Sequence, residues 1–205
     1  MIQTTPSILE DRVTTGRFDP SFTLADADIH ELVRLATKAP SAFNLQNWHF
    51  IAVRSKRNKE LLRSVSYGQR QVSEAAVTFI VCGLTNSHLT LFETLQPSVD
   101  AGLLTPSLQK TWSEMAIASH ESNPRLQRDE AIRSATFAAM CLLVAAKEMG
   151  LAAGVLGGFE PEKLHNVFGL ESNELPVVLL TVGKQAEGNW PSKMRKPVKQ
   201  VLTYR

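Results

Sequence analysis

The feature that most constrains the fold is a long predicted helix, residues 127–150, which is apolar on nearly all sides from Ala135 to Met149. A helix that is apolar all round has to be buried completely. The chain has 205 residues, which suits a single domain. So small a domain can hardly cover every face of this helix by itself. We therefore expect residues 1–205 to form one domain with this helix at a dimer interface, and Gly150 to end the helix.

Composition and motif spacing argue against several classes of protein. The net charge of +2 is too small for a nucleic-acid binder that neutralises phosphates, and the five histidines do not stand at metal-ligand spacings. Cys82 and Cys141 each lie in an apolar run, which is typical of reduced core cysteine. Residues 1–10 lack the regions of a signal peptide, and no stretch of about 18 apolar residues predicts a membrane span. We expect a cytoplasmic protein without metal, nucleic-acid partner or membrane anchor.

Shorter segments show clear helix and strand signals. Residues 48–53, 77–82, 151–156 and 175–183 read as strands, and the second is a continuous apolar run, as expected when both faces of a strand are covered. Helical periodicity predicts helices over residues 29–39 and 56–65. Thr23 and Asp26 resemble a capping box before the first of these, and Pro161 begins a further helix.

A candidate binding loop lies between a predicted helix and a predicted strand, at residues 39–50. It combines a proline, small residues and side-chain amides: Pro40, Ser41, Ala42, Asn44, Gln46 and Asn47. Small residues let a ligand approach the backbone, and amides can both donate and accept hydrogen bonds. Binding groups concentrate on loops that rigid elements hold. An ordinary helix-to-strand connection is an alternative of equal weight.

Two basic segments, one near each end of the chain, could bind an anion. Arg12 and Arg17 offer guanidinium groups and Thr14 a hydroxyl, although a frayed, solvated helix explains this segment equally well. Lys193 and Arg195 belong to a basic tail. Such tails are usually solvated or bind acidic partners. This one can also pack, because it carries apolar residues: Trp190, Val198, Val201, Leu202 and Tyr204.

In order and spacing, these segments resemble the nitroreductase family, homodimeric flavoproteins that hold FMN at the subunit interface. The resemblance rests on residues 39–50, on Phe18-Asp19-Pro20, and on residues 69–74, 150–159 and 193–195. It implies an α+β fold with a central, mostly antiparallel sheet flanked by helices, in an intertwined homodimer. Residues 189–205 would extend to the partner subunit. Residues 86–125 would form a variable excursion near the substrate pocket. Phe92, Trp112 and His120 could line that pocket, although packing or a surface position suits each of them better.

The resemblance also implies which residues bind the FMN phosphate and ribityl chain. They are Arg12, Thr14, Lys193 and Arg195. A further basic residue usual in this motif is Gly16 here, and Arg17 next to it could take its place or point elsewhere. The loop residues Pro40, Ser41, Ala42 and Asn44 would face the flavin bound to the partner.

The flavin ring system would contact two further segments. Gln69 and Gln71 would face its pyrimidine edge, where many relatives carry a lysine at the position of Gln71. Without the resemblance, both glutamines read as surface residues. In the turn formed by Leu156, Gly157 and Gly158, a backbone N–H would reach flavin N5. The acidic residue often found before the second glycine is absent, and the glycine pair could also form only a tight turn.

The chain shows neither a G-x-S-x-G motif nor a pair of carboxylates suited to acid–base catalysis. This suits an enzyme whose cofactor carries the chemistry. The resemblance implies that hydride passes from NAD(P)H through flavin N5 to a nitroaromatic, a quinone or a similar small electron acceptor, by a ping-pong mechanism and without a catalytic side chain. A flavin-binding protein for storage or sensing, and a basic module that binds polyanions, are the alternatives.

Overall fold

The computed structural model describes residues 5–205, with side chains from residue 8 onward. The first four residues, part of the segment where no signal peptide is expected, lie outside the described residues. The elements follow one another as α1 Thr5–Asp11, α2 Asp26–Ala36, η1 Ala42–Asn44, β1 Trp48–Val53, α3 Lys56–Ser64, α4 Arg70–Glu74, β2 Val77–Leu84, η2 Ser87–Thr90, α5 Leu91–Asp100, α6 Pro106–His120, α7 Pro124–Glu148, β3 Ala152–Leu156, α8 Pro161–Phe168, β4 Glu174–Gly183 and η3 Val198–Gln200.

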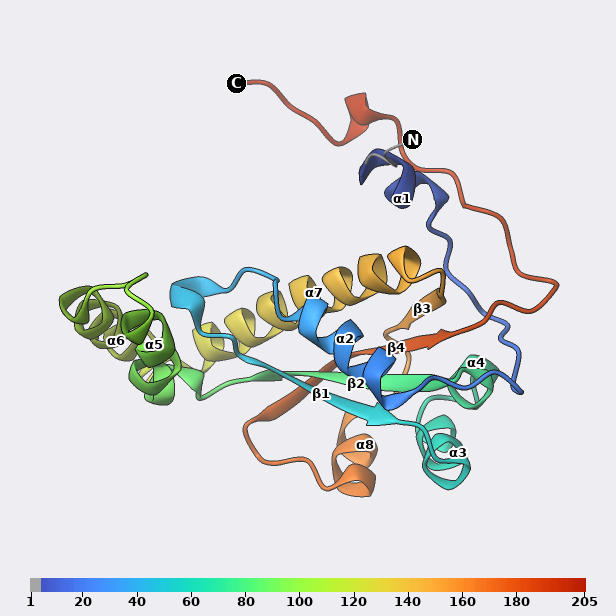
Figure 1. Ribbon diagram of the computed structural model, residues 1–205, viewed down its shortest axis with the longest axis horizontal. Helices are drawn as coiled ribbons and strands as arrows, with labels where there is room; N and C mark the ends of the chain where they lie inside the picture. The colour runs from blue at the N-terminus through green and yellow to red at the C-terminus, as the bar shows by residue number, and fades with distance from the viewer. Residues whose placement is uncertain (1–4) are drawn as a thin grey trace.

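The centre of the fold is a four-stranded sheet with the strand order β1-β2-β4-β3. Each neighbouring pair of strands is antiparallel. Side chains of β2 alternate between the faces: Phe79 and Val81 pack with α2 and α7, whereas Ile80 packs with α3 and α8. Helices thus cover both faces of the sheet (Figure 1). This arrangement confirms the predicted α+β class and antiparallel sheet.

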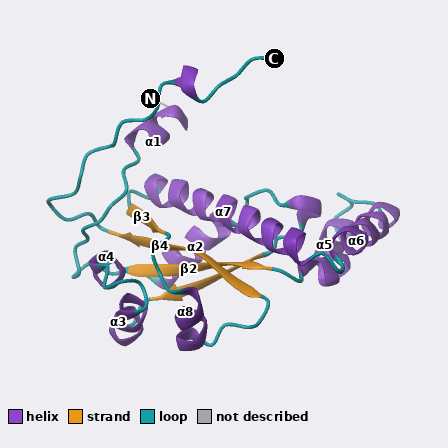
Figure 2. Cartoon of the chain, turned by 180° about the vertical axis from the view of Figure 1, so that it is seen from behind, coloured by secondary structure: helices purple, strands orange, loops and turns teal. Residues whose placement is uncertain are grey.

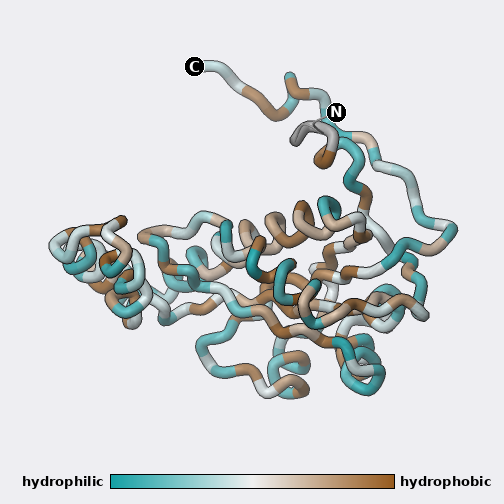
Figure 3. The backbone as a smooth tube through the Cα atoms, viewed as in Figure 1, coloured by the Kyte–Doolittle hydropathy of each residue, from teal (hydrophilic) through white to brown (hydrophobic). Residues whose placement is uncertain are grey.

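Helix α7 lies along one face of the sheet, where small residues let it approach closely. A Cβ added to Gly83 of β2 would lie only 2.3 Å from the carbonyl oxygen of Ala131. The opposite side of α7 is not covered within this chain, because Phe137 is 49% exposed and Met140 is 39% exposed. One chain by itself thus leaves part of this helix exposed, as the sequence led us to expect. Figure 3 shows apolar residues along α7 and the strands, and again on the C-terminal tail.

Residues 86–125 form mainly two helices, α5 and α6, which lie beside the sheet at one end of α7 (Figures 1 and 2). Leu91 and Leu95 of α5 pack with Ala116 of α6 and with the half-buried ring of Trp112. His88 and His120 are buried and stacked, with their ring centres 5.4 Å apart. Of the three residues considered for a substrate pocket, Trp112 and His120 therefore pack inside this unit, and Phe92 is partly exposed.

One predicted helix start is wrong. Helix α2 begins at Asp26, three residues after Thr23, because Leu24 is buried in the core and the backbone stays extended through Ala25. The N–H of Ala25 lies 3.4 Å from the Oδ2 atom of Asp28, which takes over the role expected of Asp26.

The two ends of the chain leave the body on the same side. Helix α1 and the tail after β4 both project from it, as Figures 1 and 2 show. Every residue from Trp190 to Arg205 is exposed, and the apolar ring of Trp190 is 78% exposed. None of the helices within residues 5–205 is both long and apolar enough to cross a bilayer.

Candidate functional site

The N-terminal segment after α1 and the C-terminal tail together enclose a cavity of about 190 Å³. Its walls are Arg12, Val13, Thr14, Gly16, Trp190, Pro191, Ser192, Lys193 and Arg195. Three of these residues are cations and two, Thr14 and Ser192, offer hydroxyls, and none of the described wall residues is acidic. The structure therefore brings together the four residues predicted for the phosphate, which come from opposite ends of the sequence.

Backbone hydrogen bonds hold the N-terminal segment against the sheet and the start of the tail. The N–H of Thr15 donates to the carbonyl oxygen of Ala153 on β3 over 3.0 Å. The N–H of Asp19 donates to the carbonyl oxygen of Lys184 over 2.9 Å, and the N–H of Ala186 donates to the carbonyl oxygen of Arg17 over 3.1 Å. Residues 17–19 thus pair antiparallel with the segment just after β4, and Thr15 is bonded to β3, which places Thr14 and Gly16 in the cavity wall.

Arg17 does not line this cavity. Its guanidinium lies against Gly188, where an added Cβ would be 3.4 Å from the Nη1 atom of Arg17. Neighbouring residues of an extended segment point to opposite sides, so the side that Gly16 faces is not the side that Arg17 faces. A Cβ added to Gly16 would meet only the Oδ1 atom of Asn189, at 4.0 Å, so a side chain would fit there.

A second group of predicted residues meets at the end of β3. The Nε2 atom of Gln69 donates to the carbonyl oxygen of Gly158 over 2.7 Å and to that of Ser66 over 3.0 Å. A Cβ added to Gly157 would meet nothing within 4 Å, and neither Gly157 nor Gly158 has a positive φ. Glycine is therefore not required there by backbone conformation. The small size of glycine instead leaves open space beside Gly157.

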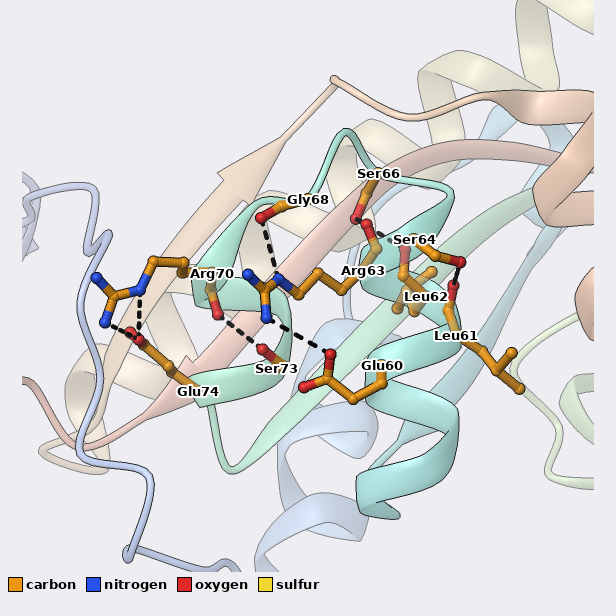
Figure 4. A network of polar contacts seen from close by, with 10 residues as sticks. All are labelled: Glu60, Leu61, Leu62, Arg63, Ser64, Ser66, Gly68, Arg70, Ser73 and Glu74. Atoms are coloured by element: carbon orange, nitrogen blue, oxygen red, sulfur yellow. Dashed lines mark hydrogen bonds and ion pairs between the residues drawn. The ribbon is translucent and has the colours of Figure 1, made fainter.

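The corner between α3 and α4, which carries Gln69, is held by its own polar contacts (Figure 4). The Nε atom of Arg63 donates to the carbonyl oxygen of Gly68 over 3.0 Å, and the hydroxyl of Ser66 donates to that of Leu62 over 2.8 Å. Arg70 pairs with Glu74 on the same helix, at 2.6 Å. Gln71 lies half-buried in the first turn of α4. The corner thus holds Gln69 in a fixed position and places Gln71 two residues further on, in α4.

The loop of residues 40–47 has a strained backbone. Phe43, Asn44 and Gln46 have φ angles of 51°, 58° and 48°, a region that costs an ordinary residue about 1–2 kcal/mol. The hydroxyl of Ser41 accepts a hydrogen bond from the N–H of Gln46 over 2.9 Å, and Leu45 is buried among α5 and α6. Strain of this kind persists where the surrounding structure fixes it, and it is common at ligand-binding sites.

This loop lies far from the cationic cavity within one chain. It precedes Trp48, which pairs with Gly83 at one end of β2, whereas Val77 at the other end pairs with Val182. The six residue steps from Val77 to Gly83 span roughly 20 Å. Pro40, Ser41, Ala42 and Asn44 are therefore not brought together with Arg12, Lys193 and Arg195 in the same protomer.

The two cysteines do not offer a reactive thiolate. Burial raises the pKa of the Cys82 thiol to about 12, and burial also raises the pKa of Cys141, so neither is a thiolate at neutral pH. Within residues 5–205, no three His, Cys, Asp or Glu side chains gather in a way that could hold a metal ion.

Sequence reasoning missed Asn189, which lies between the cavity and the body of the protein. Its side-chain amide makes four hydrogen bonds, to the backbone of Gly16, Arg17 and Ala186. A single asparagine in a Gly-Asn-Trp stretch belongs to no motif, so the sequence held no signal for it.

Comparison with known proteins places this geometry in context. Residues 9–184 match the model of the nitroreductase family. The YodC protein of Bacillus subtilis (strain 168) is 30% identical over 200 residues, which are 98% of each chain. The oxygen-insensitive NADPH nitroreductase of Helicobacter pylori (strain ATCC 700392 / 26695) is 25% identical over 92% of this chain and 91% of its own. A solved structure of an Exiguobacterium sibiricum protein in complex with FMN superimposes with a TM-score of 0.91, at 23% identity over 100% of this chain and 99% of that one.

Proposed function

Because the chain belongs to the nitroreductase family, we propose that it is an FMN-dependent NAD(P)H oxidoreductase that works as a homodimer. The observation that carries this proposal is the cationic cavity, which draws its walls from the two ends of the sequence. When bound, FMN supplies the redox chemistry, in which a hydride from NAD(P)H is passed on to a small acceptor such as a nitroaromatic or a quinone. The chain's own residues bind and orient the reactants.

The cavity walls fit a phosphate. A flavin phosphate carries up to two negative charges, and Arg12, Lys193 and Arg195 provide the opposite charge around a space of about 190 Å³. Guanidinium groups bind phosphate oxygens through paired hydrogen bonds, and the hydroxyl of Thr14 adds a further donor. The role of these four residues in our proposal is to hold the FMN phosphate and the adjoining ribityl chain.

The remaining chain residues would hold the ring system. Gln69 is fixed against Gly158 by a hydrogen bond of 2.7 Å, and open space at Gly157 allows a planar group to approach the backbone of the turn. Gln71, in the same corner, would face the polar edge of the ring. This chain offers neutral amides there, so it would stabilise added negative charge on the ring less than a lysine would.

A second copy of the chain would supply the strained loop. Residues 40–44 lie at the opposite end of the sheet from the cavity, and α7 and the tail both leave apolar side chains exposed. Pairing of two chains through α7, with each tail reaching across the other, would cover these surfaces. It would also let Pro40, Ser41, Ala42 and Asn44 of one protomer complete the site of the other.

In our proposal the acceptor follows NAD(P)H into the same site, by a ping-pong mechanism. We place the protein in the cytoplasm, where NAD(P)H is available and thiols such as Cys82 and Cys141 stay reduced. The alternative, a flavin-binding protein without turnover, would share the phosphate cavity. Reduction by NAD(P)H, followed by reoxidation by an acceptor, separates the two proposals.

The experiment that tests the function is an absorption spectrum of the purified protein, recorded without oxygen before and after addition of NAD(P)H. We expect a flavin spectrum that bleaches with NAD(P)H and returns with a quinone. Bound flavin that NAD(P)H cannot reduce would favour storage or sensing. A protein that takes up no flavin, even when FMN is added, would contradict the assignment entirely.

The dimer is tested by light scattering coupled to size-exclusion chromatography, with flavin absorbance followed in the same run. We expect two chains per particle at micromolar concentration, with the flavin eluting in that peak. A monomer that keeps its FMN would contradict the composite site.

A further inference from the structure

Asn189 is the last point at which the C-terminal tail is fixed to the body of this chain. Its Oδ1 atom accepts hydrogen bonds from the N–H groups of Gly16 and Arg17, over 2.7 and 3.0 Å. Its Nδ2 atom donates to the carbonyl oxygens of Arg17 and Ala186, both over 2.9 Å. The amide therefore uses both its donors and both its acceptor positions, which fixes its orientation.

Beyond Asn189 the tail has no comparable anchor among the described residues of its own chain. Every residue from 190 to 205 is exposed. Within the described residues, no hydrogen bond joins this stretch to the body. The guanidinium of Arg195 donates only to the carbonyl oxygen of Lys193, two residues before it. Lys193 and Arg195 nevertheless line the same cavity as Arg12 and Thr14. Their approach to the N-terminal segment therefore depends on the residue where the tail leaves the body.

We infer that Asn189 is a positioning residue that sets the preference for phosphorylated over unphosphorylated flavin, by holding Lys193 and Arg195 opposite Arg12. This inference rests on the proposed function. Asn189 itself is not among the cavity walls, so it acts through its neighbours. Three of its four hydrogen bonds reach Gly16 and Arg17, which are 173 and 172 positions away in the sequence, so Asn189 links the two halves of the cavity.

The test compares FMN with riboflavin, which lacks the phosphate. Holoprotein is loaded with either flavin by dialysis and then diluted, and the fluorescence of released flavin gives the dissociation constant. Asn189→Ala should raise the dissociation constant of FMN about tenfold, because Lys193 and Arg195 are no longer held opposite Arg12. The dissociation constant of riboflavin should change by less than about twofold, since riboflavin has no phosphate for those cations to bind. Asn166→Ala, at an exposed asparagine of α8, is the matched control and should leave both constants unchanged.

A second comparison separates positioning from a general loss of structure. In a protein that already carries Lys193→Ala and Arg195→Ala, adding Asn189→Ala should change the FMN constant by less than about twofold. The inference would be overturned if Asn189→Ala still raised the FMN dissociation constant about tenfold in the protein that lacks both tail cations. It would also be overturned if Asn189→Ala weakened riboflavin binding as much as FMN binding.

The outcomes also distinguish this inference from the function on which it rests. If the wild-type protein holds neither flavin, the proposed function itself is wrong. If wild type holds FMN and Arg195→Ala weakens it, while Asn189→Ala does not, the cofactor site stands and only the role of Asn189 is refuted.

Discussion

Replacing Gly154 by alanine should push the N-terminal segment away from the sheet. A Cβ at this position of β3 would lie 2.4 Å from the carbonyl oxygen of Thr15 and 3.0 Å from the Oγ1 atom of Thr181. Both threonines are buried, and the nearer atom belongs to the backbone. No flexible side-chain end is therefore available to move aside, and the whole of residues 14–16 has to shift.

The size of the effect follows from this distance. An ordinary contact begins at 3.4 Å, so the carbonyl group has to retreat by the difference from 2.4 Å, which is 1.0 Å. That retreat would stretch the 3.0 Å hydrogen bond from the N–H of Thr15 to Ala153. Overpacking of this kind typically lowers the free energy of unfolding by about 1–3 kcal/mol. For a chain of this length each kcal/mol corresponds to about 2–4 °C in the melting temperature, so a loss of roughly 2–12 °C is expected.

The matched control is Gly157→Ala, only three positions away. An added Cβ there meets nothing within 4 Å and the φ angle is not positive, so the melting temperature should stay constant or rise slightly. Differential scanning calorimetry of the three proteins, each without added flavin, measures the difference directly. FMN binding should also weaken in Gly154→Ala, because Thr14 and Gly16 in the cavity wall move with Thr15. Equal melting temperatures for the two alanine variants would refute the reasoning.

Three further predictions concern charge. Arg195→Ala should raise the dissociation constant of FMN roughly ten- to a hundredfold, as measured by fluorescence of released flavin; an unchanged constant would remove Arg195 from the site. Gln71→Lys should raise the midpoint potential of bound FMN by some tens of millivolts, at about 30 mV per 1.4 kcal/mol, and a fall on potentiometric titration would contradict the electrostatic argument. Burial, helped by His120, lowers the pKa of His88 below 6.5. As the pH falls, the unfolded chain therefore binds this proton before the folded chain does. The free energy of unfolding should decrease below pH 6.5, and it should decrease less steeply in His88→Gln. If denaturant titrations at several pH values gave the same pH dependence for both proteins, His88 would not be the group responsible.

The elements could be predicted because their signals are local. The bounds of β1 agree with prediction, since an apolar run follows a proline and several turn-forming residues. The start of α2 could not be predicted in the same way. Thr23 and Asp26 satisfy a short-range capping pattern, but burial of Leu24 in the core keeps the backbone extended past the expected start. Tertiary packing therefore decided between a helix that begins after Thr23 and one that begins at Asp26.

The candidate site was harder to predict because it depends on which side of an extended segment each residue faces. Arg17 and Gly16 are neighbours, and the sequence could not say which of them faces the cations of the tail. Pairing of residues 15–19 with β3 and with the segment after β4 fixes that choice, and it turns Arg17 towards Gly188. Asn189 was missed for the same reason, since its partners are brought to it only by the fold.

The strained loop of residues 40–47 links the fold to the proposed dimer. Three positive φ angles within four residues are costly, and the loop is held by Leu45, whose partners belong to α5 and α6. Residues 86–125 thus support a loop that lies at the opposite end of the sheet from the cavity of its own chain. If each chain lends this loop to the other, the excursion shapes the partner's site through the loop as well as by its own helices. Variation in α5 and α6 would then alter acceptor choice while leaving the phosphate cavity of both chains unchanged.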